Sequence, residues 1–354
     1  LISALWNATY NQIYAANAVY NKTALSPLGI ADRNQFQGEA LFVRAILHFY
    51  LVNLFGGVPY VTTTDYMVNN SAPRMPEDLV YDKIIEDLRQ AETLLPEDYL
   101  TGDRARPNKA AVQGLLARVY LYRGLWAEAA DMASAVINNQ ALYMWEENLD
   151  AVFLRESSTT IWQLATAYEG RNTDEASAFI FTAGPPTTVA LSDDLVAQFT
   201  ADDLRRTHWV NAVTDGTDTW YHAFKYKQRD DTGVTMEFSV VLRLAEQYLI
   251  RAEARARQGE LIGAKEDLNK VRNTAGLGNT TAVTQEALLA AVLLERRLEL
   301  FTEYGHRFFD LKRNGLLDNA LSFKPGWTST DELWPLPQSE LLVNTALQPQ
   351  NPGY

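Results

Sequence analysis

Residues 39–59 read EALFVRAILHFYLVNLFGGVP, and this stretch indicates how the chain folds. Over 39–55, apolar residues cover nearly every face of a helix, and only Arg44 and His48, one turn apart, form a polar stripe. We therefore predict a helix that is buried on most sides, with His48 as a hydrogen-bonded core residue. Gly56-Gly57-Val58-Pro59 ends it, because glycine just past the last turn and proline soon after are typical of helix C-termini.

Helical periodicity continues over much of the chain. Apolar residues between Tyr81 and Leu95 recur at helical spacing and predict an antiparallel partner for this first helix. Two later segments, 114–136 and 252–271, have small residues, a glycine and apolar residues at the spacing of a tetratricopeptide repeat, in which two helices pack closely and each pair stacks on the next. The predicted fold class is all-α, a tetratricopeptide-like scaffold of helix pairs.

Residues 145–238 interrupt the helical pattern. Thr160–Leu164 is strand-like, and Gly184-Pro185-Pro186 and Asp231-Thr232-Gly233 indicate turns. We predict a single domain, 1–354, with N-terminal helical repeats in 1–144, an irregular, partly β insertion in 145–238, and C-terminal helical repeats with a packed tail in 239–354. Loops on a rigid scaffold commonly carry binding sites, so the insertion is the expected ligand-binding part.

The chain ends in a tail rich in proline, with Leu333-Trp334-Pro335-Leu336-Pro337 followed by Gln350-Asn351-Pro352-Gly353-Tyr354. Proline cannot donate to a helical or strand hydrogen-bond ladder. We therefore expect side-chain packing and irregular hydrogen bonds to hold the tail, with Trp334, Leu336 and Tyr354 as its anchors.

Composition excludes several functions. The net charge of −13 disfavours nucleic acid and anionic lipid as partners, because both need a basic face. The chain has no cysteine, which excludes disulfides and thiolate zinc sites, and its four histidines are scattered, so we expect neither a metal nor a cofactor. Leu1 is not an initiator methionine and no signal segment is recognisable, so any signal peptide or lipidated cysteine is expected upstream.

Several stretches, in order along nearly the whole chain, resemble the SusD/RagB family of nutrient-binding lipoproteins. They are Arg44–Tyr50 with Leu54–Pro59, Arg106–Ala111, Leu242–Glu246 with Tyr248–Ala254, Asp267–Asn269, Glu295–Leu300, Asp310–Arg313 and the proline-rich tail. The resemblance implies a non-enzymatic, lipid-anchored protein on the bacterial outer surface, used in polysaccharide utilisation. It would bind an oligosaccharide, or in some relatives a peptide, and deliver it to a TonB-dependent outer-membrane transporter. Family members usually have more residues before the helix that begins near Trp6, and the central insertion is short for the family, which suggests a small ligand footprint.

Aromatic residues in turn-rich segments are the candidates for sugar stacking, since a ring can cover the apolar face of a sugar while polar neighbours bond its hydroxyls. The expected ligand-binding residues are the rings of Tyr168, Trp209, Trp220, Tyr221 and Trp327, together with the polar side chains of Arg171 and Asn172.

Two alternatives remain open. Glu295, Glu299 and Glu303 lie on one helix face, and Glu295 with Glu299 could be the carboxylate pair of an all-α glycoside hydrolase. Like charges at this spacing repel unless cations lie between them, which favours a structural ion network with nearby arginines. The candidate cations are Arg243, Arg251, Arg296, Arg297 and Arg307. The second alternative is a cytosolic repeat scaffold for protein partners.

Overall fold

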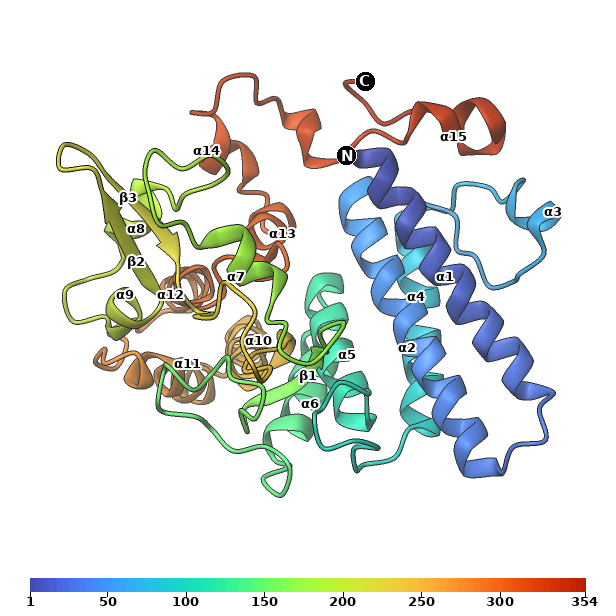
Figure 1. The fold of residues 1–354 in the computed structure, drawn as a ribbon, viewed down its shortest axis with the longest axis horizontal. Coiled ribbons are helices and arrows are strands. Elements are labelled where there is room, and N and C mark those ends of the chain that lie inside the picture. Colours follow the sequence, from blue (N-terminus) through green and yellow to red (C-terminus); the bar gives the residue numbers. More distant parts are fainter. The chain divides into compact units, whose positions relative to one another are not determined.

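The computed structural model describes residues 1–354 and consists of α-helices with a few short strands (Figure 1). The predicted fold class is confirmed. The chain forms two compact units: the first contains residues 1–98, 107–123 and 308–354, and the second contains 99–106 and 124–307. These units cut across the three consecutive parts expected from the sequence, because the C-terminal tail belongs with the N-terminal helices.

Four long helices build the first unit. They are α1 (Ile2–Ala24), α2 (Ile30–Phe55), α4 (Glu77–Leu94) and α5 (Lys109–Arg123), and each packs on the next. Arg44 contacts Asp87 and Asn53 contacts Tyr81, so α2 and α4 run antiparallel, as predicted. By length and composition α2 could cross a membrane. Most of its apolar stretch, however, is buried within the protein, as in a core helix.

The polar stripe of α2 is buried and satisfied. Arg44 Nε lies 2.6 Å from Asp87 Oδ2, and Arg44 Nη1 lies 2.9 Å from Asn17 Oδ1. His48 is fully buried, and its Nδ1 lies 2.8 Å from the Arg44 carbonyl oxygen. Burial lowers the pKa of His48 to about 3, so the ring is neutral and forms part of the core, as predicted.

The rest of the first unit is made of short elements. These are α3 (Tyr66–Asn69), α14 (Leu317–Leu321), η1 (Ser329–Glu332), α15 (Gln338–Val343) and η2 (Thr345–Leu347), while α13 (His306–Arg313) begins in the second unit and ends in the first. In Figure 1 the red tail with α15 lies beside the dark blue start of α1.

The tail completes the end of α2. The last carbonyl oxygens of a helix have no partner within it. Here the Asn53 carbonyl oxygen accepts from the Lys312 ammonium at 2.8 Å, and that of Leu54 accepts from the Trp334 amide at 2.7 Å. The Phe55 carbonyl oxygen accepts from the Asn351 side chain at 2.9 Å. The tail is therefore part of the hydrogen bonding of the core helix.

Only part of the anchor prediction is correct. Leu336 is 1% exposed and is an anchor. Trp334 is half-buried and packs edge-on against Phe55 at 6.0 Å between ring centroids. Tyr354 is 54% exposed, so its assignment as an anchor is wrong. Asn351 takes its place, because its buried amide also donates to the Trp334 carbonyl at 2.7 Å and contacts Arg74.

The second unit is built on α6 (Trp126–Ile137), α10 (Leu244–Arg257), α11 (Leu261–Thr274) and α12 (Gln285–Glu299). Helix α10 packs against the other three, and Ala252, Ala264 and Leu268 lie in the shared core, as the repeat pattern predicts. The other predicted pair has the expected helices and a turn at Gly124, with φ +70°. Its members, however, belong to different units: α5 packs on α4, and α6 packs on α10.

The irregular insertion lies within the second unit. Its short helices are α7 (Asp174–Phe179), α8 (Asp193–Gln198) and α9 (Leu204–His208). The predicted strand is confirmed as β1 (Thr160–Leu164), which pairs antiparallel with β4 (Ser239–Arg243). A separate hairpin joins β2 (Val210–Thr214) to β3 (Thr219–Ala223). Its turn is closed by the Asp215 carboxylate, which accepts hydrogen bonds from the amides of Thr217 and Asp218.

Candidate ligand-binding cleft

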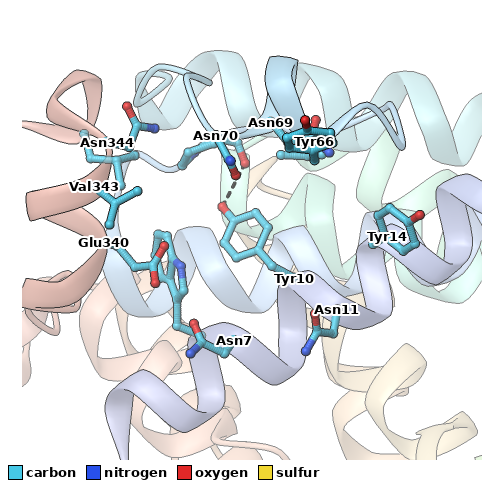
Figure 2. Close-up of a pocket in the computed structure, with 14 residues that line it drawn as sticks. Asn7, Tyr10, Asn11, Tyr14, Tyr66, Asn69, Asn70, Glu340, Val343 and Asn344 are labelled. Carbon is cyan, nitrogen blue, oxygen red and sulfur yellow. Dashed lines mark hydrogen bonds between the residues drawn. The ribbon is translucent and has the colours of Figure 1, made fainter.

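A cleft of about 450 Å³ lies in the first unit, a volume typical of small-molecule sites. Its walls come from α1, from the segment that contains α3, and from the tail around α15 (Figure 2). The lining residues are Trp6, Asn7, Tyr10, Asn11 and Tyr14 of α1, Pro59, Val61, Tyr66, Asn69 and Asn70 of the second wall, and Glu340, Val343, Asn344 and Leu347 of the tail.

The cleft has an apolar base and a polar rim. Trp6, Pro59, Val61 and Leu347 are buried, so the base of the cleft is apolar. Helical spacing explains the α1 wall, because positions 7, 11 and 14 fall on one face of a helix. This amide and tyrosine stripe was visible in the sequence as an uncharged, asparagine-rich segment, but local pattern alone does not say what a helix face will look onto.

The rim carries unused hydrogen-bonding groups. The side chains of Asn7, Asn11, Asn70 and Glu340 make no hydrogen bond within the protein. Such groups must bond either water or a ligand. Each amide offers both donors and acceptors, whereas the carboxylate only accepts. This arrangement is suited to a ligand with many hydroxyl groups.

Two tyrosines on the rim present open rings. Tyr14 is 50% exposed and Tyr66 is 70% exposed, and neither hydroxyl is used within the protein. Figure 2 shows them at one end of the cleft, with Glu340 at the other. An exposed ring beside free amides can stack on the apolar face of a sugar.

Other side chains hold the walls in place. Asn344 donates to the Ala72 carbonyl oxygen at 2.8 Å and accepts from the Ala346 amide at 3.0 Å. The Tyr10 hydroxyl donates to the Pro59 carbonyl oxygen at 2.9 Å, the dashed line in Figure 2. Burial, and to a lesser degree the charge of Glu340, raises the pKa of Tyr10, so its hydroxyl stays a donor at neutral pH. The tail, α1 and the α3 segment are thus tied together around the cleft.

Two of the seven ligand-binding residues expected from the sequence are structural. Trp209 is fully buried in the core of the second unit, and its Nε1 donates to the Leu149 carbonyl at 2.9 Å. Asn172 is 4% exposed and bonds the Asp230 carbonyl oxygen, the Thr232 hydroxyl and the Met236 amide. These two assignments are wrong, because an irregular segment still has to bury rings and satisfy its own backbone.

Tyr168 and Arg171 lie together on the surface of the second unit. The Arg171 guanidinium lies 6.0 Å from the centre of the Tyr168 ring. Tyr168 is 55% exposed, but its hydroxyl donates to Asp231 at 2.8 Å, and Arg171 pairs with Asp174. Their polar atoms are already engaged, unlike the side-chain amides of Asn7, Asn11 and Asn70 in the cleft.

The three remaining rings are half-buried. Trp220 lies flat against Gly184, where an added Cβ would come within 2.1 Å of the indole. The Arg206 guanidinium covers Tyr221 at 4.7 Å from the ring centre. Trp327 belongs to the first unit, and its Nε1 donates to Asp318 at 2.9 Å.

The three glutamates of α12 and the turn after it form a buried ion network in the second unit. Arg205 lies 2.7 Å from Glu295 and 3.0 Å from Glu299, and Arg243 lies 2.6 Å from Glu299 and 2.8 Å from Glu303. Glu295 and Glu299 are at most 5% exposed, so they do not line an open cleft as a hydrolytic pair must. The structural interpretation is confirmed in its geometry.

The partners of this network were only partly predicted. Arg243 is a member, as expected, but Arg251 pairs with Asp267 and Arg297 with Asp194. Arg205 and Lys225, the other buried cations, come from the insertion and were missed, because their contacts with α12 are distant in sequence.

This network should make the protein sensitive to acid. Burial opposes the ionisation of Glu299 and Glu303, but the surrounding cations, Arg243 foremost, together outweigh it, so the pKa values of both carboxyl groups lie below the ordinary 4.5. A lowered pKa contributes stability above the unfolded-state pKa that is lost as pH falls through the folded-state pKa. Glu295 partly offsets this, because burial raises its pKa.

We therefore expect the melting temperature to fall below about pH 4.5. The Glu299→Gln variant cannot titrate at this position, so the difference between its melting temperature and that of the unmodified protein should shrink on acidification. Thermal melts of the two proteins over a pH series measure both effects. A difference that stays constant with pH would contradict a lowered pKa of Glu299.

Comparison with known proteins gives a consistent result. A family described as "Starch-binding associating with outer membrane" matches residues 2–121, and the SusD family matches residues 194–329. The SusD-like protein P2 of Formosa agariphila is 28% identical over 414 residues, which cover 100% of this chain and 81% of that protein. The structure of a laminarin-binding SusD-like protein is 26% identical with a TM-score of 0.85, over 99% of this chain and 86% of that one. A SusD superfamily protein from Parabacteroides distasonis has the same fold, with 24% identity and a TM-score of 0.84, over 100% of this chain and 86% of that one.

Proposed function

The chain belongs to the SusD/RagB family, and on this premise we propose that it captures an oligosaccharide in the α1–α3–tail cleft without breaking any bond. The bound sugar would then pass to a TonB-dependent outer-membrane transporter, with the protein held at the cell surface by a lipid anchor. Association with the outer membrane agrees with the description of the matching family.

The observation that carries this proposal is the set of free amides on the rim of a preformed cleft. Asn7, Asn11 and Asn70 offer donors and acceptors that no protein group uses, and Tyr14 and Tyr66 add open rings. Sugar hydroxyls need partners of both kinds, and sugar faces need aromatic surface. The laminarin-binding relative supports a glycan as the ligand class.

A non-catalytic role is supported by the state of the acidic residues. Glu295 and Glu299, the pair that would serve a hydrolase, are buried and paired with arginines. The cleft contains a single carboxylate, Glu340, whereas glycoside hydrolysis ordinarily needs two. Incubation with a bound oligosaccharide should release no reducing sugar, and release that is lost in Glu299→Gln would contradict the proposal.

We expect Asn11→Ala and Tyr14→Ala each to weaken oligosaccharide binding about tenfold, since each removes a hydrogen bond or stacking contact of about 1–1.5 kcal/mol. Both residues are exposed on α1, so the melting temperature should stay unchanged. Isothermal titration calorimetry measures the affinity, with a glycan array and a peptide library used first to select the ligand.

The surface rings of Tyr168, Trp220 and Trp327 are the alternative location of the site. Their alanine variants serve as matched controls and should bind normally. If these variants lose affinity while Asn11→Ala and Tyr14→Ala keep it, the site lies outside the cleft. Selection of peptides and no glycan would instead indicate a peptide-binding member of the family.

A further inference from the structure

The cleft has an unusual charge distribution, which bears on the class of glycan it would take. Glu340 is the one charged residue among those that line it, and no lysine or arginine does so. The Glu340 carboxylate forms neither an ion pair nor a hydrogen bond within the protein. Figure 2 shows its side chain directed from the tail toward α1.

Arg74, which follows the second wall in sequence and does not line the cleft, is engaged in bonds within the protein. Arg74 donates to the Gly57 carbonyl oxygen at 2.7 Å, to Pro349 at 2.8 Å and to Phe55 at 3.2 Å, and it also contacts Asn351. These bonds hold the tail against the end of α2. A sulfate or uronate group in the cleft would therefore face Glu340 with no cation to compensate it.

The remaining polar groups of the rim are neutral. Asn7, Asn11 and Asn70 can bond hydroxyls, and Tyr14 and Tyr66 can stack on uncharged sugar faces. A carboxylate accepts through two oxygens, so Glu340 can receive two neighbouring hydroxyls of one sugar ring.

We propose that the cleft selects uncharged oligosaccharides, with Glu340 accepting a pair of sugar hydroxyls and repelling sulfated or uronate-containing glycans. This inference rests on the proposed glycan binding and specifies its ligand class. It assigns Glu340 as the residue that determines specificity.

The test compares four oligosaccharides of equal length: a neutral β-glucan, an alginate, a carrageenan and a chitosan. Calorimetry on the full chain should give binding of the neutral glucan that is insensitive to salt, because no charge on the ligand is screened. The alginate and carrageenan should bind at least about tenfold more weakly, since they place a like charge beside Glu340.

Reversing the charge of residue 340 should change the selectivity. Glu340→Lys should bind the neutral glucan about tenfold more weakly, because a lysine only donates hydrogen bonds. It should bind the anionic glycans more tightly, because its charge attracts sulfate and carboxylate. Glu340→Gln should lower the affinity for the neutral glucan by a smaller factor and reduce the discrimination against anionic glycans. Glu128→Lys, an equal charge change at an exposed position on α6, is the control and should bind as the unmodified protein does.

Three results would overturn the inference. Alginate or carrageenan could bind as tightly as the neutral glucan, or Glu340→Lys could leave the selectivity unchanged. Chitosan could bind most tightly and lose this advantage in Glu340→Gln, which would make the site one for cationic sugars. All three leave glycan capture itself intact, whereas failure of every glycan to bind would overturn the proposed function as well.

Discussion

Replacement of Glu299 by alanine is expected to lower the free energy of unfolding by about 3–5 kcal/mol, because it leaves buried charges without their partner. Glu299 is 5% exposed and lies 2.6 Å from Arg243 and 3.0 Å from Arg205. Without it, Arg205 and Arg243 would keep their remaining carboxylates, but each would lose a charged hydrogen bond in a site that water does not reach. Calorimetric melting of the full chain measures the effect.

The matched control is Glu156→Ala. The Glu156 side chain is 83% exposed, and its ion pair with Arg155 is long, at 3.7 Å. Exposed pairs contribute about 0–1 kcal/mol, so this variant should melt close to the unmodified protein. An unchanged melting temperature in Glu299→Ala, together with loss of glycan binding, would instead assign Glu299 to the binding site.

Deletion of the tail should have an effect at least as large. A chain ending at Asp331 loses Leu336, Leu341 and Leu347, each at most 3% exposed. Burial of three such side chains contributes about 5–9 kcal/mol, which is comparable to the whole stability of a typical domain. We expect this chain to be insoluble or to aggregate on purification. A soluble product with the melting temperature of the full chain would show that the tail contributes nothing to the core.

Two point variants test whether Asn351 or Tyr354 anchors the tail. Asn351→Ala removes the side-chain donor of the Trp334 carbonyl oxygen and one of the two side-chain donors of the Phe55 carbonyl oxygen, which keeps its bond from Arg74, at a cost of about 1–3 kcal/mol. Tyr354→Ala removes an exposed ring with one hydrogen bond, to Asp331, and should change stability by less than about 0.5 kcal/mol. Thermal melts of the two variants compare them directly, and the opposite ranking would restore Tyr354 as the anchor.

The helices were predictable because their signals are local. The apolar faces of α2 and α4 and the small residues of α10 and α11 repeat every three to four positions, and glycine ends helices wherever a positive φ is needed, as at Gly56. The strand β1 and the family resemblance rest in the same way on contiguous or ordered residues.

Predictions of a residue's role failed where that role depends on side-chain partners far away in the sequence. Trp209 and Asn172 lie in segments that look like exposed loops, but each fills a buried position created by residues far along the chain. Arg205 was missed for the same reason, since its contacts with Glu295 and Glu299 span about 90 residues of sequence. The pattern of a single segment contains no information on such pairings.

The sequence by itself determined the all-α class, the C-terminal end of α2, the strong acidity and the resemblance to the SusD/RagB family, because each follows from periodicity, composition or ordered motifs. Only the tertiary structure decided where the candidate site lies. Asn7, Asn11 and Tyr14 acquire a facing wall when residues 340–347 return across the chain to α1, and the tail does so because the carbonyl oxygens at the end of α2 require donors that it provides.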